Sequence, residues 1–258
     1  MIEWEDRHKN FDRVKFLLAE AGPNPGDLIV LPEMFDSGFS LNTKRTADSE
    51  NKTLGFLRDL AIQTECTVQG GRTVLQSGQL ATNTAPVFSP TGSQLAEYAK
   101  IHPFSFGREP EAFQAGNEIV TYPWGELGDG TGGLTVCPAI CYDLRFPELF
   151  RLGLLKGAQM FAIGANWPAA RAEHWRALLI ARAIENQAFV LGVNRTGSDP
   201  YLQYRGGTIA IGPKGDVLGE LGDEQAVLSV DIDPGEVAEW RKTFPAWQDL
   251  RLIGPGGD

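Results

Sequence analysis

The chain has 258 residues, 42% of them hydrophobic, with a formal net charge of −10. It can bury a large core, and its acidity repels phosphate backbones and anionic lipid surfaces, so we expect no nucleic-acid or membrane partner. There is no apolar run of membrane-spanning length and no basic, apolar leader segment. The three cysteines are few and odd in number, which argues against a disulfide framework. These features favour a cytoplasmic protein.

Helical periodicity and short apolar runs alternate early in the chain, and strand-like runs dominate later. The spacing of apolar residues predicts helices at 11–21, 57–64, 147–156 and 171–187. Apolar runs between turn signals predict strands at 28–31, 67–75, 85–88, 134–140, 160–163, 189–193, 207–211 and 226–230. The pattern is typical of a layered α/β fold whose sheets are covered by helices, and the absence of a linker or repeat predicts one domain over 1–258.

Two motifs that would indicate a cofactor are unconvincing. Residues 128–133 satisfy G-x-G-x-x-G literally, but they precede a predicted strand, whereas a dinucleotide site follows a strand and opens a helix. The three histidines, His8, His102 and His174, lack metal-ligand spacing, and no C-x-x-C occurs. The residues therefore indicate neither a dinucleotide site nor a metal site.

A glutamate follows the first predicted strand directly. Glu33 stands between Pro32 and the apolar pair Met34 and Phe35. Partial desolvation there would raise the pKa of the carboxyl and make it a usable base. A solvated loop carboxylate is the common alternative for a single glutamate.

Lys100 and Cys141 are the other two candidates. Lys100 lies in the run Tyr-Ala-Lys-Ile-His and is either an ordinary surface lysine or an ammonium that stabilises an oxyanion and a thiolate in a pocket. Cys141 ends a predicted strand just before the helix that starts near Pro147, a position that would lower its thiol pKa and place the Tyr142 N–H beside it. A buried structural position is the common alternative for a free cysteine. Cys66 and Cys137 fit it, whereas the polar residues that follow Cys141 argue against it there.

In this order the three residues resemble the nitrilase, or carbon–nitrogen hydrolase, superfamily. Glu33 matches its Pro-Glu motif, Lys100 its K-x-H motif and Cys141 its C-Y-D-x-R-F-P-E motif. The similarity continues through 165–168, 182–187, 192–195 and 212–215, so it covers nearly the whole chain. Glu109 stands where the family carries a second glutamate, and Glu111 is the alternative.

The resemblance implies a four-layer α-β-β-α sandwich that dimerises through helices, and an amidase that uses no cofactor. Glu33 would take the thiol proton, Cys141 would attack an amide carbon, and Lys100 with the Tyr142 N–H would hold the oxyanion. Glu109 would position the lysine or the substrate nitrogen. The expected partners are a small-molecule amide and a second copy of the chain.

Segments 103–106, 141–148, 166–168 and 244–247 resemble the ω-amidase branch. That branch hydrolyses the side-chain amide of 2-oxo acids such as 2-oxoglutaramate and 2-oxosuccinamate. Such an anion would need a further cation, for which Arg145 and Arg171 are candidates, although helix-surface salt bridges are an alternative role for both. Tyr142, Asn166 and Trp167 complete the expected substrate site.

One departure and three alternatives stay open. Family members open with an apolar strand that is missing before residues 2–6, so we expect translation to start upstream or the chain to be truncated. The same machinery could act on an N-carbamoyl amine or a deaminated-glutathione-like peptide. The fold could serve a non-catalytic binding protein, against which the intact Glu33, Lys100 and Cys141 argue. A papain-like pair would need His102 or His174 as base.

Overall fold

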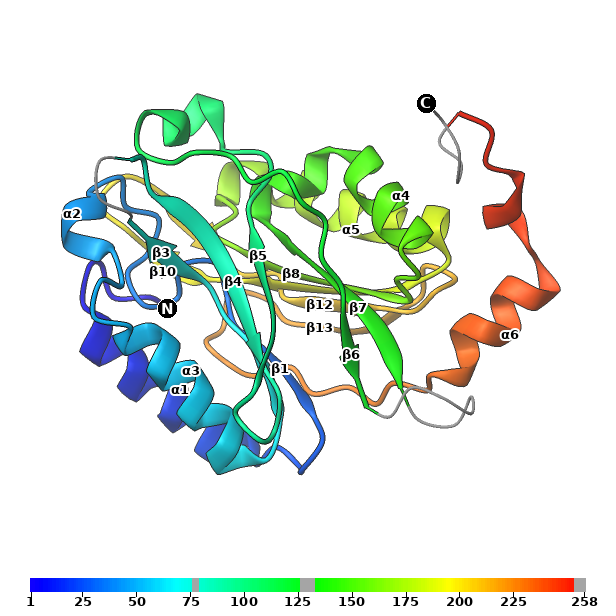
Figure 1. Cartoon of the computed structure of the whole chain (residues 1–258), viewed down its shortest axis with the longest axis horizontal. Helices are drawn as coiled ribbons and strands as arrows, with labels where there is room; N and C mark the ends of the chain where they lie inside the picture. The colour runs from blue at the N-terminus through cyan, green and yellow to red at the C-terminus, as the bar shows by residue number, and fades with distance from the viewer. Residues whose placement is uncertain (76–78, 126–132, 253–258) are drawn as a thin grey trace.

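Two β-sheets lie face to face between two layers of helices (Figure 1). The computed structural model describes residues 1–75, 79–125 and 133–252, so most of the literal glycine motif, at 128–132, lies outside the described residues. Within them, one sheet contains β1 (Leu28–Val30), β2 (Thr67–Gln69), β3 (Arg72–Val74), β4 (Thr82–Phe88) and β5 (Gln94–Ala99). The other contains β6 (Tyr122–Trp124), β7 (Leu134–Ile140), β8 (Met160–Ala165), β9 (Phe189–Asn194), β12 (Ile209–Ile211) and β13 (Val217–Glu220).

A small hairpin, the α-helices and several 3-10 turns complete the described chain. A separate hairpin joins β10 (Thr196–Ser198) to β11 (Gln203–Arg205). The α-helices are α1 (Arg7–Ala21), α2 (Thr43–Thr46), α3 (Lys52–Thr64), α4 (Pro147–Leu155), α5 (Ala172–Asn186) and α6 (Gly235–Thr243). Single 3-10 turns are η1 (Ser105–Gly107), η2 (Glu109–Glu111), η3 (Cys141–Arg145), η4 (Ala169–Arg171) and η5 (Ala246–Asp249). No helix of the described residues has the length and apolar character needed to cross a membrane.

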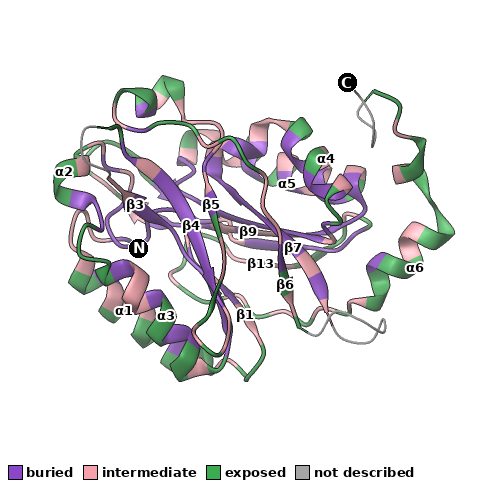
Figure 2. Ribbon diagram, in the orientation of Figure 1, coloured by how far each residue is buried: buried purple, intermediate pink, exposed green. Residues whose placement is uncertain are grey.

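Three apolar layers hold the sandwich together. Helices α1 and α3 pack on the sheet of β1 to β5, where Leu57 of α3 meets Val68 of β2. Helices α4 and α5 pack on the other sheet, where Leu179 of α5 meets Val190 of β9. A third cluster, which includes Val87 of β4, fills the space between the sheets, and the central strands are accordingly buried (Figure 2). This is the α-β-β-α arrangement that the sequence resemblance implies.

The strand order brings the ends of several strands to one place. β7, β8 and β9 are neighbours and parallel, so their carboxyl ends lie at the same edge of the sheet. Residues that follow parallel strands are the usual source of functional groups in such sheets. Cys141 follows β7 and Asn166 follows β8 at this edge.

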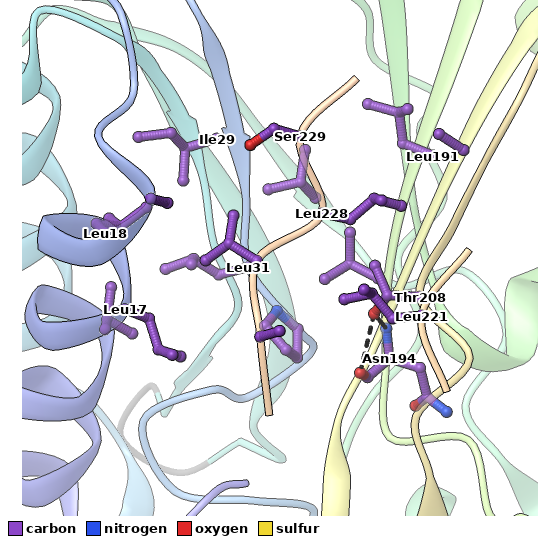
Figure 3. A pocket seen from close by; sticks show the side chains of 18 of the residues that line it. Leu17, Leu18, Ile29, Leu31, Leu191, Asn194, Thr208, Leu221, Leu228 and Ser229 are labelled. Carbon is purple, nitrogen blue, oxygen red and sulfur yellow. Dashed lines mark hydrogen bonds between the residues drawn. The ribbon is translucent and has the colours of Figure 1, made fainter. Parts of the chain in front are cut away.

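The predicted strand at 226–230 is wrong. These residues belong to no strand, and no backbone hydrogen bond joins them to the rest of the described chain. Among the described strands β1 pairs with β2 alone, and a cavity of about 920 Å³ lies beside it. Figure 3 shows Leu228 and Ser229 between Ile29 and Leu31 on one wall and Leu191 on the other. Because no strand adjoins residues 226–230, their apolar alternation produces no ladder.

Candidate active site

The three candidate residues come from both sheets. Lys100 directly follows β5, and Glu33 follows β1 after two residues, so the first sheet supplies both. Cys141 directly follows β7 of the second sheet. The side chains of Glu33 and Lys100 lie at the edge where the two sheets meet, here called the seam, and both are buried from solvent.

Glu33, Lys100 and Glu109 form one buried cluster. The Lys100 Nζ donates to Glu33 Oε1 at 2.8 Å and to Glu109 Oε2 at 2.8 Å, and each of the three residues is at most 2% exposed. Glu109 also accepts the backbone N–H of Phe104, which fixes its carboxylate at the start of η2. Glu111, the alternative to Glu109, is outside the cluster, since it is exposed and pairs with Arg108 at 2.6 Å.

Asn83 is a member of this cluster that the sequence reasoning missed. Its Nδ2 donates to Glu33 Oε1 at 2.8 Å and to Glu109 Oε1 at 3.1 Å, so one amide bridges both carboxylates. Asn83 lies on β4, and its carbonyl accepts the Lys100 N–H. An asparagine in a strand that was predicted to start at residue 85 carried no local signal of this role.

The second sheet also binds Glu33. The Asn166 N–H donates to Glu33 Oε2 at 3.0 Å, and Asn166 Nδ2 donates to the Glu33 carbonyl at 2.6 Å. Asn166 therefore positions the glutamate from across the seam, a role that differs from the substrate contact expected for its side chain.

Glu33 and Lys100 both stay charged. Burial acts to raise the pKa of Glu33, but the Lys100 ammonium and the donors Asn83 and Asn166 together hold it below its usual range. Burial likewise acts to lower the pKa of Lys100, and Glu109 and Glu33 raise it well above its ordinary value. The expectation that desolvation would raise the pKa of Glu33 is wrong, because the neighbouring ammonium outweighs burial.

Cys141 lies in a tight turn beside the cluster. Its φ of +46° is left-handed, an uncommon backbone conformation for a residue other than glycine. Burial raises the pKa of its thiol well above the ordinary value, Glu33 adds to the shift and Lys100 opposes it. The predicted lowering of the thiol pKa is therefore wrong, because burial and the Glu33 carboxylate outweigh the Lys100 ammonium.

A pocket of about 610 Å³ opens onto Cys141 and Lys100. All five residues predicted for substrate binding line it, namely Tyr142, Arg145, Asn166, Trp167 and Arg171. Lining residues that the sequence reasoning missed include Phe39, Asp199 and Tyr204. The lining thus combines aromatic walls with a few polar groups, which is typical of a site for a small molecule.

The two arginines lie on aromatic rings rather than on carboxylates. The Arg145 guanidinium lies 4.8 Å from the centre of the Trp167 ring, and that of Arg171 lies 5.4 Å from the centre of the Phe104 ring. Among the described residues neither arginine makes an ion pair. The surface salt-bridge role considered for them is absent from this part of the chain.

Neither histidine considered as a base contacts the thiol. His102 Nδ1 lies 2.8 Å from Asp143 Oδ1, and His174 Nδ1 lies 3.3 Å from Arg145 Nη2. Within the described residues, no hydrogen bond joins either imidazole to Cys141. The arrangement favours a carboxylate base over a papain-like pair.

Comparison with known proteins gives consistent matches over most of the chain. The sequence profile described as carbon-nitrogen hydrolase matches residues 2–242. A 2-oxoglutaramate amidase of Bacillus subtilis (strain 168) is 34% identical over 97% of this chain and 94% of its own. The hydrolase in the agr operon of Staphylococcus aureus is 37% identical, over 88% and 85% of the two chains.

A solved structure agrees with these matches. The crystal structure of a CN-hydrolase superfamily protein from Xanthomonas campestris, with an arsenic adduct in its active site, superposes with a TM-score of 0.88. The two proteins are 31% identical, and the match covers 99% of this chain and 96% of the other. The fold, the buried Glu33–Lys100–Glu109 cluster and the sequence matches converge, and the chain belongs to the carbon-nitrogen hydrolase, or nitrilase, family.

Proposed function

We propose that the protein is an amidase that hydrolyses a small carboxylic amide to acid and ammonia through a thioester on Cys141. One observation carries this proposal: Glu33, Lys100 and Glu109 form a buried carboxylate–ammonium cluster, and its Lys100 lines the same pocket as Cys141. A base, a cation and a nucleophile in one desolvated site are the groups that acyl transfer requires.

The first half of the reaction forms the thioester. Because the thiol pKa is raised and the Glu33 pKa is lowered, the resting enzyme holds a neutral thiol and a carboxylate. Glu33 takes the thiol proton as the sulfur attacks the amide carbon. Lys100 and the Tyr142 N–H stabilise the oxyanion, the proton passes from Glu33 to the nitrogen, and ammonia leaves.

The second half returns the enzyme to its starting state. Glu33 takes a proton from a water molecule, and the resulting hydroxide attacks the thioester carbonyl. The carbon–sulfur bond breaks, the acid leaves, and the proton on Glu33 returns to the Cys141 sulfur. Glu109 and Asn83 keep Lys100 and Glu33 in place through both halves, since their hydrogen bonds fix both charged groups.

The proposed substrates are 2-oxo acid ω-amides such as 2-oxoglutaramate and 2-oxosuccinamate. The chain carries a net charge of −10, yet the guanidinium groups of Arg145 and Arg171 line the pocket and make no ion pair with any described carboxylate, which favours a small anion as substrate. Two relatives support the same class by name: the Bacillus 2-oxoglutaramate amidase and the omega-amidase YafV of Escherichia coli (strain K12), which is 36% identical over 86% of this chain and 84% of its own.

A substrate panel tests the assignment. Ammonia release is measured with 2-oxoglutaramate, 2-oxosuccinamate, glutamine, an N-carbamoyl amine, a short deaminated-glutathione-like peptide and a nitrile. We expect the two 2-oxo acid amides to give the highest kcat/KM. A higher value for another compound would reject the ω-amidase assignment and keep the amidase chemistry, whereas no release from any compound by the folded protein would favour a binding role.

The arginines give a second test of the substrate class. Arg145→Ala and Arg171→Ala should each raise KM for 2-oxoglutaramate about tenfold, because each removes a charge-assisted hydrogen bond to the substrate carboxylate. KM for a neutral amide should stay unchanged. Arg176→Ala is the matched control, since Arg176 lies on α5 outside the pocket and pairs with Glu220. Unchanged KM in both pocket variants would reject recognition of an anion by these residues.

A further inference from the structure

The Asp143 carboxylate is fully buried and binds donors from both sheets. Its Oδ2 accepts from the Tyr98 hydroxyl at 2.7 Å and from the Ile140 N–H at 3.0 Å. Its Oδ1 accepts from the His102 N–H at 2.9 Å and lies 2.8 Å from His102 Nδ1. Within the described residues no lysine or arginine pairs with it. Hydrogen bonds from these three residues therefore compensate the cost of burying this side chain.

These donors flank the two proposed reactive residues. Tyr98 lies on β5 two positions before Lys100, and His102 lies in the loop two positions after it. Ile140 is the last residue of β7 and directly precedes Cys141, and Asp143 lies two positions after Cys141 in η3. One carboxylate thus joins the segment of the cation to the segment of the nucleophile.

The same contacts close the turn at Cys141. A left-handed backbone conformation is strained for a residue other than glycine and persists only where the surroundings hold it. The hydrogen bond from the Ile140 N–H to the Asp143 carboxylate spans Cys141. The His102 ring stacks on Phe146, which follows the turn, with 3.8 Å between the ring centres. The strained turn is therefore fixed relative to Lys100 rather than only within its own sheet.

We propose that Tyr98, Asp143 and His102 are positioning residues that hold the Cys141 sulfur in place against the Glu33–Lys100 pair. The proposal rests on the proposed function to the extent that Cys141 is the nucleophile. None of the three residues touches the substrate in this account, and each acts through the geometry of the turn.

A pair of tyrosine variants separates positioning from packing. Tyr98→Phe removes one hydroxyl from Asp143, and Tyr122→Phe removes a matched one, because Tyr122 is also buried and donates to Gln69 of the other sheet at 2.9 Å. The rate of Cys141 alkylation by iodoacetamide is measured by peptide mass spectrometry without any substrate, together with kcat, KM and Tm.

We expect Tyr98→Phe to lower the alkylation rate and kcat about tenfold with KM within about twofold, because a displaced nucleophile loses rate rather than binding. Both variants should lower Tm by similar amounts, because each removes one buried hydroxyl. Tyr122→Phe should leave the alkylation rate and kcat unchanged. Equal effects of the two variants on alkylation, or no effect of Tyr98→Phe, would overturn the proposal.

A histidine pair keeps the proposal testable if Tyr98→Phe does not fold. The His102 side chain is 25% exposed, so its replacement disturbs the core less. His102→Ala should slow alkylation, and His102→Asn should restore it, because the asparagine amide can donate to Asp143 in place of Nδ1. Equal rates in His102→Ala and His102→Asn would contradict the role.

Failure of this proposal and failure of the proposed function give different results. If the wild type releases no ammonia from any amide but the alkylation pattern holds, the amidase proposal fails and the positioning role stands. If ammonia is released and Tyr98→Phe keeps the wild-type kcat and alkylation rate, the positioning role fails and the amidase proposal stands.

Discussion

At the scale of single residues, the charges on Glu33 and Lys100 decide when Cys141 can react. The base must be ionised, and its pKa is held below the ordinary 4.5 by Lys100 and hydrogen bonds that outweigh burial. The cation must be protonated, and its pKa is held above the ordinary 10.5 by two carboxylates. Activity is therefore lost as the pH falls through the pKa of Glu33, because the base becomes protonated. Activity is also lost as the pH rises through the pKa of Lys100, because the cation loses its proton.

The expected result is a kcat/KM that is flat between about pH 5 and pH 9. The profile is measured with one amide in buffers of constant ionic strength, and circular dichroism at each pH confirms that the protein stays folded. An inflection between about pH 6 and pH 8 would contradict a Glu33 base and point to an imidazole base.

The sequence motifs and the family resemblance predicted which side chains gather, but not their protonation. Glu33, Lys100 and Glu109 lie together as the sequence motifs indicate. The direction of the pKa shifts at Glu33 and Cys141 could not be predicted, because it depends on the balance between burial and the nearest charges in three dimensions. Asn83 was missed for the same reason, since its neighbours in the fold are distant in sequence.

At the scale of elements, β8 sets the position of the loop that carries Glu33. Gly164 of β8 lies against that loop, and an added Cβ would stand 2.7 Å from the Leu31 carbonyl oxygen and 3.0 Å from the Glu33 nitrogen. Both atoms are backbone, so they cannot move aside as a flexible side chain would. A close approach of two backbones is a position where glycine is required.

Gly164→Ala should therefore displace Glu33 and lower kcat by about tenfold to a hundredfold, with a lower Tm. The matched control is Gly55→Ala in α3, where a Cβ meets nothing within 4 Å. That variant should gain about 0.5–1 kcal/mol of stability and keep its kinetics, because alanine favours a helix interior. Wild-type kcat in Gly164→Ala would show that the Glu33 loop tolerates displacement from β8.

Elements with strong apolar periodicity could be predicted, and short polar strands could not. The helix at Pro147–Leu155 and the strand at Leu134–Ile140 form as their patterns predict. β5, β10 and β13 carry exposed polar positions, so their alternation is weak, and pairing with neighbours defines them instead. Residues 226–230 show the opposite: their apolar alternation suits a strand, but no described strand pairs with them.

At the scale of the whole molecule, the proposed catalytic groups depend on how the two sheets face each other. Glu33, Lys100 and Asn83 come from one sheet, and Cys141 and Asn166 come from the other. The α-β-β-α class follows from the alternation of apolar patterns and the family resemblance. The register of one sheet on the other depends on packing between the sheets, where Val87 meets the second sheet, and no local pattern predicts it.

The homodimer implied by the family resemblance stays a prediction. Leu152 of α4 and Ile184 of α5 are exposed on the outer helical layer, where a second copy could cover them. Light scattering coupled to gel filtration should give twice the chain mass of 28.1 kDa. Leu152→Glu combined with Ile184→Glu should give the monomer mass, and a monomeric wild type at about 10 μM would contradict the prediction.

The covalent role of Cys141 is the central claim, and one comparison of three proteins tests it most directly. Ammonia release from the preferred amide is measured for the wild type, for Cys141→Ala and for Cys137→Ala, which removes a buried thiol four residues away. Rapid acid quenching followed by peptide mass spectrometry detects an acyl group on the Cys141 peptide. We expect release by the wild type and by Cys137→Ala, no release by Cys141→Ala, and an acyl adduct only where Cys141 is present. Wild-type turnover in Cys141→Ala would contradict the account.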